Sequence, residues 1–418
     1  MNQTILLKSP PEDIPVDFAT APKRVATTTD VAPPAVRFTI HHDLSALEQK
    51  WRAFAETADG TAFQTYEWLT TWQQYVGQRQ GVHPIVVIGT DSKNELLFLL
   101  PLAIERLGPA RCLTWLGSDL CDYNAPLLAP DFSRCVGAVA FAQLWHHILE
   151  EIRRRPELRF DLVRLEKMPE VVGRQSNPFR GLAVSENPSH AYQARLGSDW
   201  DAFYAEKRSS NTRRRDRAKR KKLSEMGEVR FVTPESPEEV TRSLQTLIHQ
   251  KTLALTRMGA ANFFARPGWS DFFCAIAASP QARQLVHVSR LDVGAIWAAI
   301  NLGLLHRGCY YHVLASYDAG ETSRFGAGAA HLHDLMRYAI DRGCDVFDFT
   351  IGDEPYKRDW CDVELTLYDH LNAWSALGRI MVAWLATKRT IKRTIKRTPL
   401  LWNAAMKVRS FASSLRRR

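Results

Sequence analysis

Residues 316–360 decide the fold, and they read SYDAGETSRFGAGAAHLHDLMRYAIDRGCDVFDFTIGDEPYKRDW. Apolar side chains recur at helical spacing over residues 329–342, and Gly343 follows at the position where a helix commonly ends. Residues 346–349 are mostly apolar and are typical of a buried strand. The sequence therefore predicts a strand end, a glycine turn, a helix, a buried strand and then a polar cluster at residues 352–357.

Two glycines, Gly326 and Gly328, lie in the turn before this helix. Small residues at a helix start let an anion approach the free backbone N–H groups, so the turn is a candidate phosphate site. The polar cluster would stand beside it, because the next strand delivers it there. An ordinary loop glycine pair is the alternative, since a lone G-x-G is a weak motif.

Length and composition indicate a globular protein. The 418 residues are 45% hydrophobic and contain no apolar run long enough to cross a bilayer. The first residues show no basic segment followed by an apolar one, so we expect no secretory signal. The seven cysteines include no C-x-x-C pair, which favours a reducing cytoplasm and gives no indication of a metal site.

The net charge of +10 is concentrated in two segments. Residues 207–222 carry ten basic residues and one acidic residue, and residues 370–418 carry twelve basic residues and none that is acidic. We expect any anionic partner to meet one of these segments.

The order of expected elements suggests an internal duplication. Residues 1–35 have too few large apolar side chains to order themselves, so we expect a disordered segment there. The predicted domains are residues 36–185 and 186–372, each with helices first and a strand meander next, followed by a basic amphipathic tail at 373–418. Within the second domain, DVELTLYDHL at residues 362–371 is expected to form one strand.

Five stretches together resemble the CelD-type, BcsL-like proteins of cellulose and exopolysaccharide gene clusters, within the GNAT acyl-CoA N-acyltransferase superfamily. They are FQTYEWLTTW (63–72), DLCDYNAPLL (119–128), SSNTRRRDRAKRKKLSEMG (209–227), YYHVLASYD (310–318) and FDFTIGDEPYKRDW (347–360). The last is the most specific, and its Y-K-x-x-W element is also similar to the Fem-type aminoacyl transferases.

The resemblance implies an α+β fold of two tandem GNAT-like domains with mixed, largely antiparallel sheets and flanking helices. It also implies transfer of an acyl group from acyl-CoA, such as acetyl-CoA, to an amine or hydroxyl of a small molecule or polysaccharide precursor. A role in cellulose or exopolysaccharide biosynthesis would follow. No metal is implied, and the site would lie in the cytoplasm.

The GNAT loop that binds the CoA pyrophosphate has the form Q/R-x-x-G-x-G/A. Here Ser323 occupies the Q/R position, Arg324 follows it, and Gly326 and Gly328 match the glycines. Arg324 could still reach a phosphate, and the four residues are the cofactor-binding candidates.

Acyl transfer needs a deprotonated acceptor, a polarised thioester carbonyl and a protonated or stabilised leaving thiolate. Asp353 and Asp348 are candidates for the base or a substrate clamp, Lys357 for oxyanion stabilisation and Tyr356 for protonation of the thiolate. The structural alternatives are a backbone-bonded strand aspartate, a solvated lysine and a packing aromatic.

Acceptor binding is expected to involve residues from both domains. Asp122 and Tyr123 would face the second domain across a cleft, although an ordinary turn aspartate is the alternative. Further candidates are Lys251, Tyr311 and Trp360.

The basic segments leave several alternatives open. The basic helix is either a solvated charge run or a contact for the phosphates of CoA, an anionic acceptor or, with aminoacyl-tRNA as donor, RNA; the helix lacks interleaved aromatics, so nucleic acid is the weakest of these. The tail has an apolar helical stripe, so it either docks on its own domain or lies on an anionic membrane surface, peripheral at the inner membrane. In the second case the chain could be a non-catalytic scaffold of a polysaccharide synthase. The stripe comprises Trp374, Leu377, Met381, Trp384 and Leu385.

Overall fold

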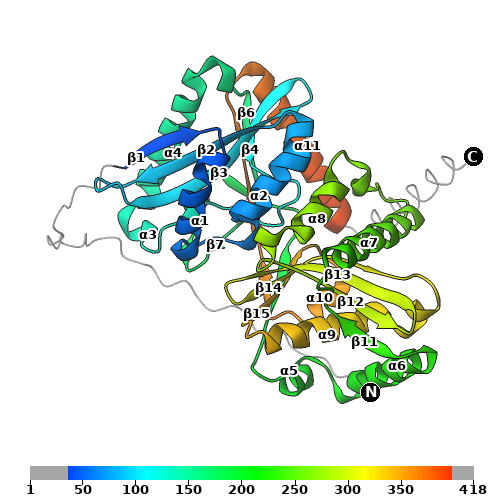
Figure 1. The fold of residues 1–418 in the computed structure, drawn as a ribbon. Helices are drawn as coiled ribbons and strands as arrows, with labels where there is room; N and C mark the ends of the chain where they lie inside the picture. Colours follow the sequence, from blue (N-terminus) through cyan, green and yellow to red (C-terminus); the bar gives the residue numbers. More distant parts are fainter. Residues whose placement is uncertain (1–35, 398–418) are drawn as a thin grey trace, which may run out of the picture.

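A computed structural model of the protein describes residues 36–397, which form two units, each built on one β-sheet covered by helices (Figure 1). The expected disordered segment 1–35 and the last part of the tail, 398–418, lie outside the described residues. Within residues 36–397 the longest helices fall short of the length and apolarity that a membrane span needs.

The first unit is built on an eight-stranded sheet in the order β1-β2-β3-β4-β6-β17-β9, with β5 paired to β3. Its strands are β1 (Arg37–His41), β2 (His83–Thr90), β3 (Leu96–Leu107), β4 (Ala110–Trp115), β5 (Leu127–Leu128), β6 (Leu162–Pro169), β9 (Val184–Glu186) and β17 (Leu367–Ala373). Its helices are α1 (Glu48–Thr57), α2 (Tyr66–Trp72), α3 (Phe132–Cys135), α4 (Ala138–Arg154) and α11 (Ala376–Arg397), and a small hairpin joins β7 (Val171–Val172) to β8 (Gln175–Ser176).

The second unit is built on a seven-stranded sheet in the order β11-β12-β13-β14-β15-β10-β16. Its strands are β10 (Ala191–Arg195), β11 (Val229–Val232), β12 (Val286–Val293), β13 (Ile296–His306), β14 (Cys309–Tyr317), β15 (Val346–Ile351) and β16 (Val363–Leu365). Its helices are α5 (Trp200–Lys207), α6 (Ser210–Met226), α7 (Pro237–Arg257), α8 (Trp269–Ala278), α9 (Ala327–Asp341) and α10 (Pro355–Arg358).

The expected fold class is confirmed. The predicted meander is β12-β13-β14, and in each sheet all neighbours are antiparallel except one central pair, β4 with β6 and β14 with β15. The decisive helix α9 begins at Ala327, two residues before the predicted start, because Gly326 at φ 71° forms its N-cap.

The prediction of one strand at residues 362–371 is wrong. Two strands lie there: β16 pairs with β10 in the second sheet, while β17 pairs with β6 and β9 in the first. Apolar and polar side chains alternate without a break from Val363 to Leu367, so the sequence hides the point near Thr366 where the chain leaves one sheet for the other. The domain limits at residues 185 and 372 stay a prediction. Two strands of the first sheet, β9 and β17, run across these two positions.

The two units share an aromatic core. The Trp68 ring of α2 meets Phe272 of α8 edge to face with centroids 4.8 Å apart, and Figure 1 shows these two helices side by side. Phe63 contacts Tyr311 of β14 at 5.8 Å. Burial of large aromatic rings on both sides fixes the units against each other.

Helix α11 docks on the first unit. Leu385 is buried against Ala110, Cys112 and Leu162 of the first sheet, with Leu377 and Met381 packed beside it. Of the two alternatives for the tail, the structure therefore shows docking in the described part, where one face of α11 packs on the first sheet. Trp384 points away and is 51% exposed.

Candidate active site

The central feature of the second sheet is the separation of β14 from β15. They pair in parallel at three positions, the last being Tyr311 with Asp348, and no further pairing follows. The β13–β14 register shifts between Leu302 and Gly303, so that β14 carries one extra residue at Val313. Strands that separate inside a sheet leave backbone N–H and C=O groups without ladder partners, and a bulge adds to them.

A cavity of about 480 Å³ occupies this gap. Neighbouring strand residues point to opposite faces of a sheet, and Tyr310 packs in the core beneath α9 whereas Tyr311 packs in the core beneath α7. The cavity is lined by Leu332 of α9 and also by Lys251 of α7. It therefore passes through the sheet from one face to the other.

The lining residues come from both units. They include Asp122, Arg208, Lys251, His312, Val313, Tyr317, Gly328, Ala329, Leu332, Thr350, Glu354, Tyr356, Lys357 and Trp360. Among the predicted site residues, the structure thus brings Asp122, Lys251, Gly328, Tyr356, Lys357 and Trp360 together in one cavity.

Lys357 is buried in the cavity wall, with only 4% of its surface exposed. Its Nζ donates to the carbonyl oxygens of Thr350 (3.3 Å) and Ile351 (3.2 Å) and lies 2.9 Å from the Glu354 carboxylate. Thr350 has φ 58°, a strained conformation for a β-branched residue, and such strain concentrates at functional sites. Lys357 is therefore a held cation in a cavity wall, and the solvated-lysine alternative does not describe it.

The other lining groups have perturbed acidities. Burial raises the pKa of the Asp122 carboxyl, while nearby Lys167, a hydrogen bond with Thr350 and the charge of Lys357 oppose the shift. Burial lowers the pKa of Lys251, whose Nζ donates to the carbonyl oxygen of Ala315 at 3.0 Å. Burial and the Glu354 charge raise the pKa of Tyr356, so its phenol keeps its proton at neutral pH.

The glycine turn adjoins a second cavity. Gly326 lines a space of about 290 Å³ that shares Asp216, Ala329 and His333 with the main cavity. Cations of α6 and α9 surround it: Arg213, Arg217, Lys219, Arg220 and Arg337. We call this space the basic pocket.

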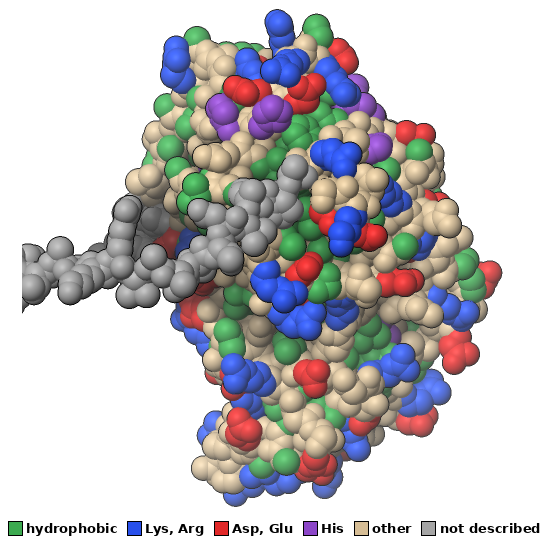
Figure 2. All heavy atoms as spheres, turned by 90° about the vertical axis from the view of Figure 1, so that its left-hand side faces the viewer, with side chains coloured by type: hydrophobic (Ala, Val, Ile, Leu, Met, Phe, Trp, Pro, Cys, Tyr) green, Lys and Arg blue, Asp and Glu red, His purple; other side chains and the backbone are tan. Residues whose placement is uncertain are grey.

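The arginines near the basic pocket differ in their partners: one pairs with a carboxylate, and two have a buried Nε without a hydrogen-bond partner in the described part of the chain. Arg220 holds Asp334 through two hydrogen bonds of 3.1 and 3.0 Å. The Nε of Arg213 and that of Arg208, which lines the main cavity, are buried without a hydrogen-bond partner in the described part of the chain. Buried donors of this kind favour an anion, because an unpaired buried N–H is costly. On the face shown in Figure 2, by contrast, Lys and Arg are interspersed with Asp and Glu.

The remaining cofactor candidates lie outside both cavities. The Ser323 hydroxyl donates to the carbonyl oxygen of Gly320 at 2.7 Å, and Arg324 lies 3.5 Å from Glu321 on the surface. Neither residue is among those that line the basic pocket.

Asp348, Tyr123 and Tyr311 line a different cavity, of about 730 Å³, between the two units. The buried Asp348 carboxylate accepts hydrogen bonds from the Tyr123 hydroxyl (2.7 Å), Gln193 Nε2 (2.8 Å) and the Thr350 amide (2.7 Å). Burial raises the pKa of Asp348 to about 6, although these hydrogen bonds oppose the shift. The prediction that Tyr123 faces the second unit is therefore met by a direct contact.

Asp353 is half-buried at the end of β15 and does not line the main cavity. Its carboxylate accepts a hydrogen bond from the His190 amide at 3.2 Å. Its predicted role as base stays a prediction.

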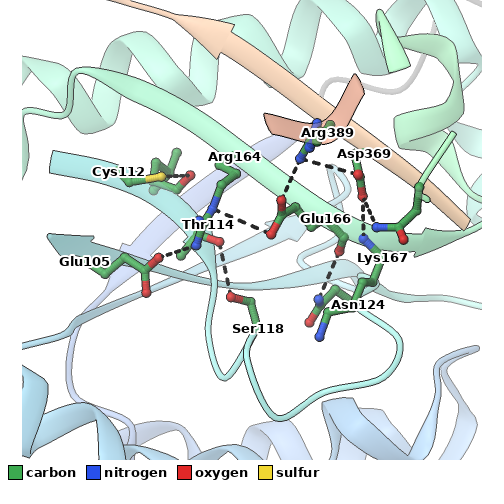
Figure 3. A network of polar contacts seen from close by, with 12 residues as sticks. Glu105, Cys112, Thr114, Ser118, Asn124, Arg164, Glu166, Lys167, Asp369 and Arg389 are labelled. Atoms are coloured by element: carbon green, nitrogen blue, oxygen red, sulfur yellow. Dashed lines mark hydrogen bonds and ion pairs between the residues drawn. The ribbon is translucent and has the colours of Figure 1, made fainter. Parts of the chain in front are cut away.

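The first unit has the same central strand pair, but a loop and a network of charges bridge its gap. Asn124 bonds to the backbone of Glu166 and Lys167 beyond the paired part of β4 and β6, at 2.9 and 3.1 Å. Figure 3 shows the neighbouring network, in which Arg164 pairs with Glu105 at 2.7 Å and Arg389 of α11 pairs with Glu166 at 2.6 Å. The loop that closes the first gap therefore also carries Asp122 and Tyr123 into the second unit.

Sequence reasoning missed His312, Glu354 and Arg208 as lining residues. His312 stands within the YYHVLASYD stretch, where strand alternation places it on the face of Tyr310, and this signal could have found it. Glu354 stands in the polar cluster predicted at residues 352–357 and Arg208 in the basic segment 207–222, so both lie in stretches that the sequence had indicated.

Comparisons with known proteins agree with this geometry. A family model described as "Acetyltransferase (GNAT) domain" matches residues 210–358. Among solved structures the chain is similar to FemX, with a TM-score of 0.55 and 10% identity over 80% of this chain and 97% of that chain. It is also similar to a conserved protein of unknown function from Bacteroides thetaiotaomicron VPI-5482, with a TM-score of 0.50 and 11% identity over 80% of this chain and 99% of that chain.

No curated protein sequence matches the chain significantly. At these identities the solved structures show the fold alone, and that fold spans both units. The matched segment runs from the basic helix α6 to α10 and so includes the glycine turn, the separated strands and Lys357. Residues 210–358 thus match the model of a GNAT acetyltransferase domain, and the fold of the two units together is similar to that of FemX.

Proposed function

We propose that the protein transfers an acyl group from acyl-CoA to an amine or hydroxyl acceptor in the main cavity of the second unit. The observation that carries this proposal is the passage through the sheet between β14 and β15, which opens toward α9 on one face and toward Asp122 and Lys251 on the other. A donor and an acceptor can enter such a passage from opposite faces and meet in its middle.

The donor would lie on the α9 side. The phosphates of CoA would occupy the basic pocket at the start of α9, where a helix N-terminus and the arginines of α6 both favour negative charge. The thioester arm would then run between the separated strands, and backbone N–H groups near the bulge at Val313 would polarise its carbonyl.

The acceptor would lie on the side of Asp122. Its nitrogen or oxygen attacks the thioester carbonyl, the carbon–sulfur bond breaks, and CoA leaves as a thiolate that takes a proton from Tyr356, which regains one from the carboxylate that received the proton of the acceptor. The proton lost by the acceptor passes to a carboxylate of the cavity, Asp122 or Glu354, and Lys357 stabilises the negative oxygen of the intermediate. We propose a small molecule or polysaccharide precursor as acceptor, as the family resemblance implies.

The experiment is a screen of acyl-CoA donors and amine acceptors by release of free thiol. We expect Lys357→Ala to lower turnover by roughly 10²–10³-fold, the usual cost of removing one oxyanion-stabilising group. Asp353→Asn changes a carboxylate outside the cavity. Its turnover tells whether the base is Asp353, as the sequence predicted, or a carboxylate that lines the cavity. Full activity of Lys357→Ala in a folded protein contradicts the assigned role.

Donor binding is measured separately as a rise in melting temperature. CoA should stabilise the protein more than dephospho-CoA or pantetheine, because these lack some or all of the phosphates that the basic pocket would hold. Arg213→Gln should remove that difference. Equal shifts with all three compounds, or none with any acyl-CoA, contradict CoA as donor.

A second candidate donor is aminoacyl-tRNA, which the similarity to Fem-type transferases and the cations of α6 favour. RNA binding through this helix predicts an affinity that falls steeply with salt. A tRNA gel shift that Arg214→Gln and Arg215→Gln weaken, with no thermal response to CoA, would favour it.

We also propose peripheral contact of α11 with an anionic membrane. Ile380, Trp384 and Ile391 are spaced by four and seven residues, so they share one helix face, and they are 67%, 51% and 55% exposed. Ile380→Ser with Trp384→Ser should reduce sedimentation with anionic vesicles, whereas Val139→Ser, at an exposed apolar residue of α4, should not. Unchanged sedimentation of the double variant contradicts this contact and the scaffold alternative with it.

A further inference from the structure

His312 is a buried histidine that lines the main cavity and has no part in the steps above. It lies on β14 directly before the bulge at Val313 and pairs with Gly303 of β13. Its ring shares the face of Tyr310 and contacts Phe347 at 5.9 Å. It therefore stands at the position where the strands begin to separate.

The hydrogen bonds of Asn301 fix one nitrogen of this ring. Asn301 is fully buried on β13, and one orientation of its amide satisfies both of its ends. In that orientation the amide oxygen accepts from the Gly303 amide (3.1 Å) and the Tyr310 hydroxyl (2.8 Å), and the amide nitrogen donates to His312 Nε2 (3.1 Å) and to the carbonyl oxygen of Leu314 (3.3 Å). His312 Nε2 is then an acceptor, so Nδ1 carries the proton.

The hydrogen bonds behind Asn301 are compatible with this orientation, which itself rests on the contacts of the Asn301 amide with Gly303, Leu314 and His312. The Tyr310 hydroxyl lies 2.9 Å from His287 Nδ1, and His287 Nε2 lies 3.1 Å from the Thr233 hydroxyl. Because Tyr310 gives its proton to Asn301, His287 donates from Nδ1 to Tyr310 and accepts from Thr233 at Nε2. Each donor in this network faces an acceptor, so the assigned directions are consistent from Thr233 to His312.

The surroundings keep His312 neutral. Burial is the main cause that lowers the pKa of His312, to about 3, and the charges of Lys357 and Lys251 add to it. His331 of α9 is also buried and neutral, since burial lowers its pKa to about 3. The carboxylates that line the cavity are Asp122, Asp216, Glu354 and Asp359, and its remaining cation is Arg208.

We propose that His312 is a neutral hydrogen-bond donor to the bound acyl donor through Nδ1–H, and that Asn301 is the positioning residue that fixes this tautomer. This inference rests on the proposed function and deepens it. The ring donates a hydrogen bond to the thioester carbonyl oxygen, which becomes negative as the acceptor attacks, and it keeps its proton throughout. Like the backbone donors near Val313, it acts where charge develops in the transition state.

The first test needs no activity. In protein with ¹⁵N-labelled histidines, the His312 signals are identified by their loss in His312→Gln. We expect a protonated Nδ1, a bare Nε2 and no titration between pH 5.5 and 8. A signal for Nε2–H in the wild-type protein, or titration near pH 6.5, overturns the proposal whether or not the protein is an acyltransferase.

Asn301→Asp replaces the amide nitrogen that donates to His312 Nε2 by an oxygen that accepts, with almost no change in the shape of the side chain. A carboxylate at this position accepts from Nε2, so it draws the proton to that nitrogen and raises the pKa of His312. We expect the Nε2–H signal to appear and the turnover number to become dependent on pH between 5.5 and 8. An unchanged tautomer in this variant means that Asn301 does not position His312.

The activity arm separates this inference from the proposed function. With an acyl-CoA that the wild-type enzyme uses, His312→Gln and His312→Phe should lower turnover by roughly 10²–10³-fold. His83→Gln, at an exposed histidine of the first unit, should leave it unchanged. Wild-type turnover in a folded His312→Phe protein refutes the role of His312, whereas no thiol release by the wild type with any donor refutes the proposed function itself.

Discussion

Replacement of Asp348 by asparagine removes a buried charge and leaves its hydrogen bonds in place. One carboxylate oxygen accepts from Tyr123 and the Thr350 amide, and the other accepts from Gln193. An asparagine oxygen can keep the first two bonds, and its NH₂ can donate to Gln193 once the Gln193 amide turns to present its oxygen. Asp348→Asn therefore isolates the cost of the charge.

The magnitude follows from the pKa of Asp348, which burial raises from 3.8 to about 6. The folded state holds this proton more tightly than the unfolded state, so stability is greatest below the unfolded pKa, falls as pH rises toward the folded pKa, and is constant above it. At 1.36 kcal/mol per pKa unit, the ionised group costs about 3 kcal/mol at pH 8 and roughly half of that at pH 5.

The assay is calorimetric unfolding of both proteins between pH 5 and 8. We expect Asp348→Asn to be the more stable protein at pH 8, with an advantage that shrinks as the pH falls, and the melting temperature to rise by several degrees at the upper end. Parallel curves across this range would refute the argument that the buried carboxylate is held charged at a cost. Thiol release by the same variant tests separately whether Asp348 takes part in catalysis.

Two further predictions concern packing. Arg389→Ala should destabilise the first unit by about 1–3 kcal/mol in urea unfolding, because it leaves the buried Asp369 without its cation and Glu166 with only the longer contact to Arg164. Arg389→Lys should retain part of this stability, and equal midpoints for wild type and Arg389→Ala would contradict the network. Gly268→Ala should lower the melting temperature far more than Gly81→Ala. Both glycines have positive φ, but only a Cβ at Gly268 overlaps backbone atoms of the other unit. Similar losses in the two variants would contradict a close contact at Gly268.

Local pattern was sufficient to predict much of the second unit. Helical spacing over 329–342 and the glycine at 343 predicted α9, and the strand meander predicted for the second domain is β12-β13-β14. These features depend on neighbours within a few residues, and the sequence displays such neighbours directly. The convergence of Gly328 with Tyr356 and Lys357 followed from the order strand, turn, helix, strand, because β15 delivers its end beside the start of α9.

The rest depends on contacts between distant parts of the chain. Tyr123 bonds to Asp348, 225 residues away, and no local signal distinguishes this tyrosine from Asp122, which enters a different cavity. Arg324 was a reasonable phosphate ligand by motif position, but the 3-10 turn at Glu321–Phe325 places it on the surface beside Glu321. Which cations of α6 face the basic pocket was likewise decided by packing on α9.

The pairing of β17 with β6 also constrains the order of events during synthesis. Residues 162–169 remain an unprotected edge until residues 367–373 have left the ribosome, some two hundred residues later. The first unit thus begins to fold first and completes its sheet last, while the second unit can complete nearly all of its sheet beforehand. Nascent chains arrested before residue 366 should consequently carry a nearly complete second sheet attached to a first sheet that still lacks β17.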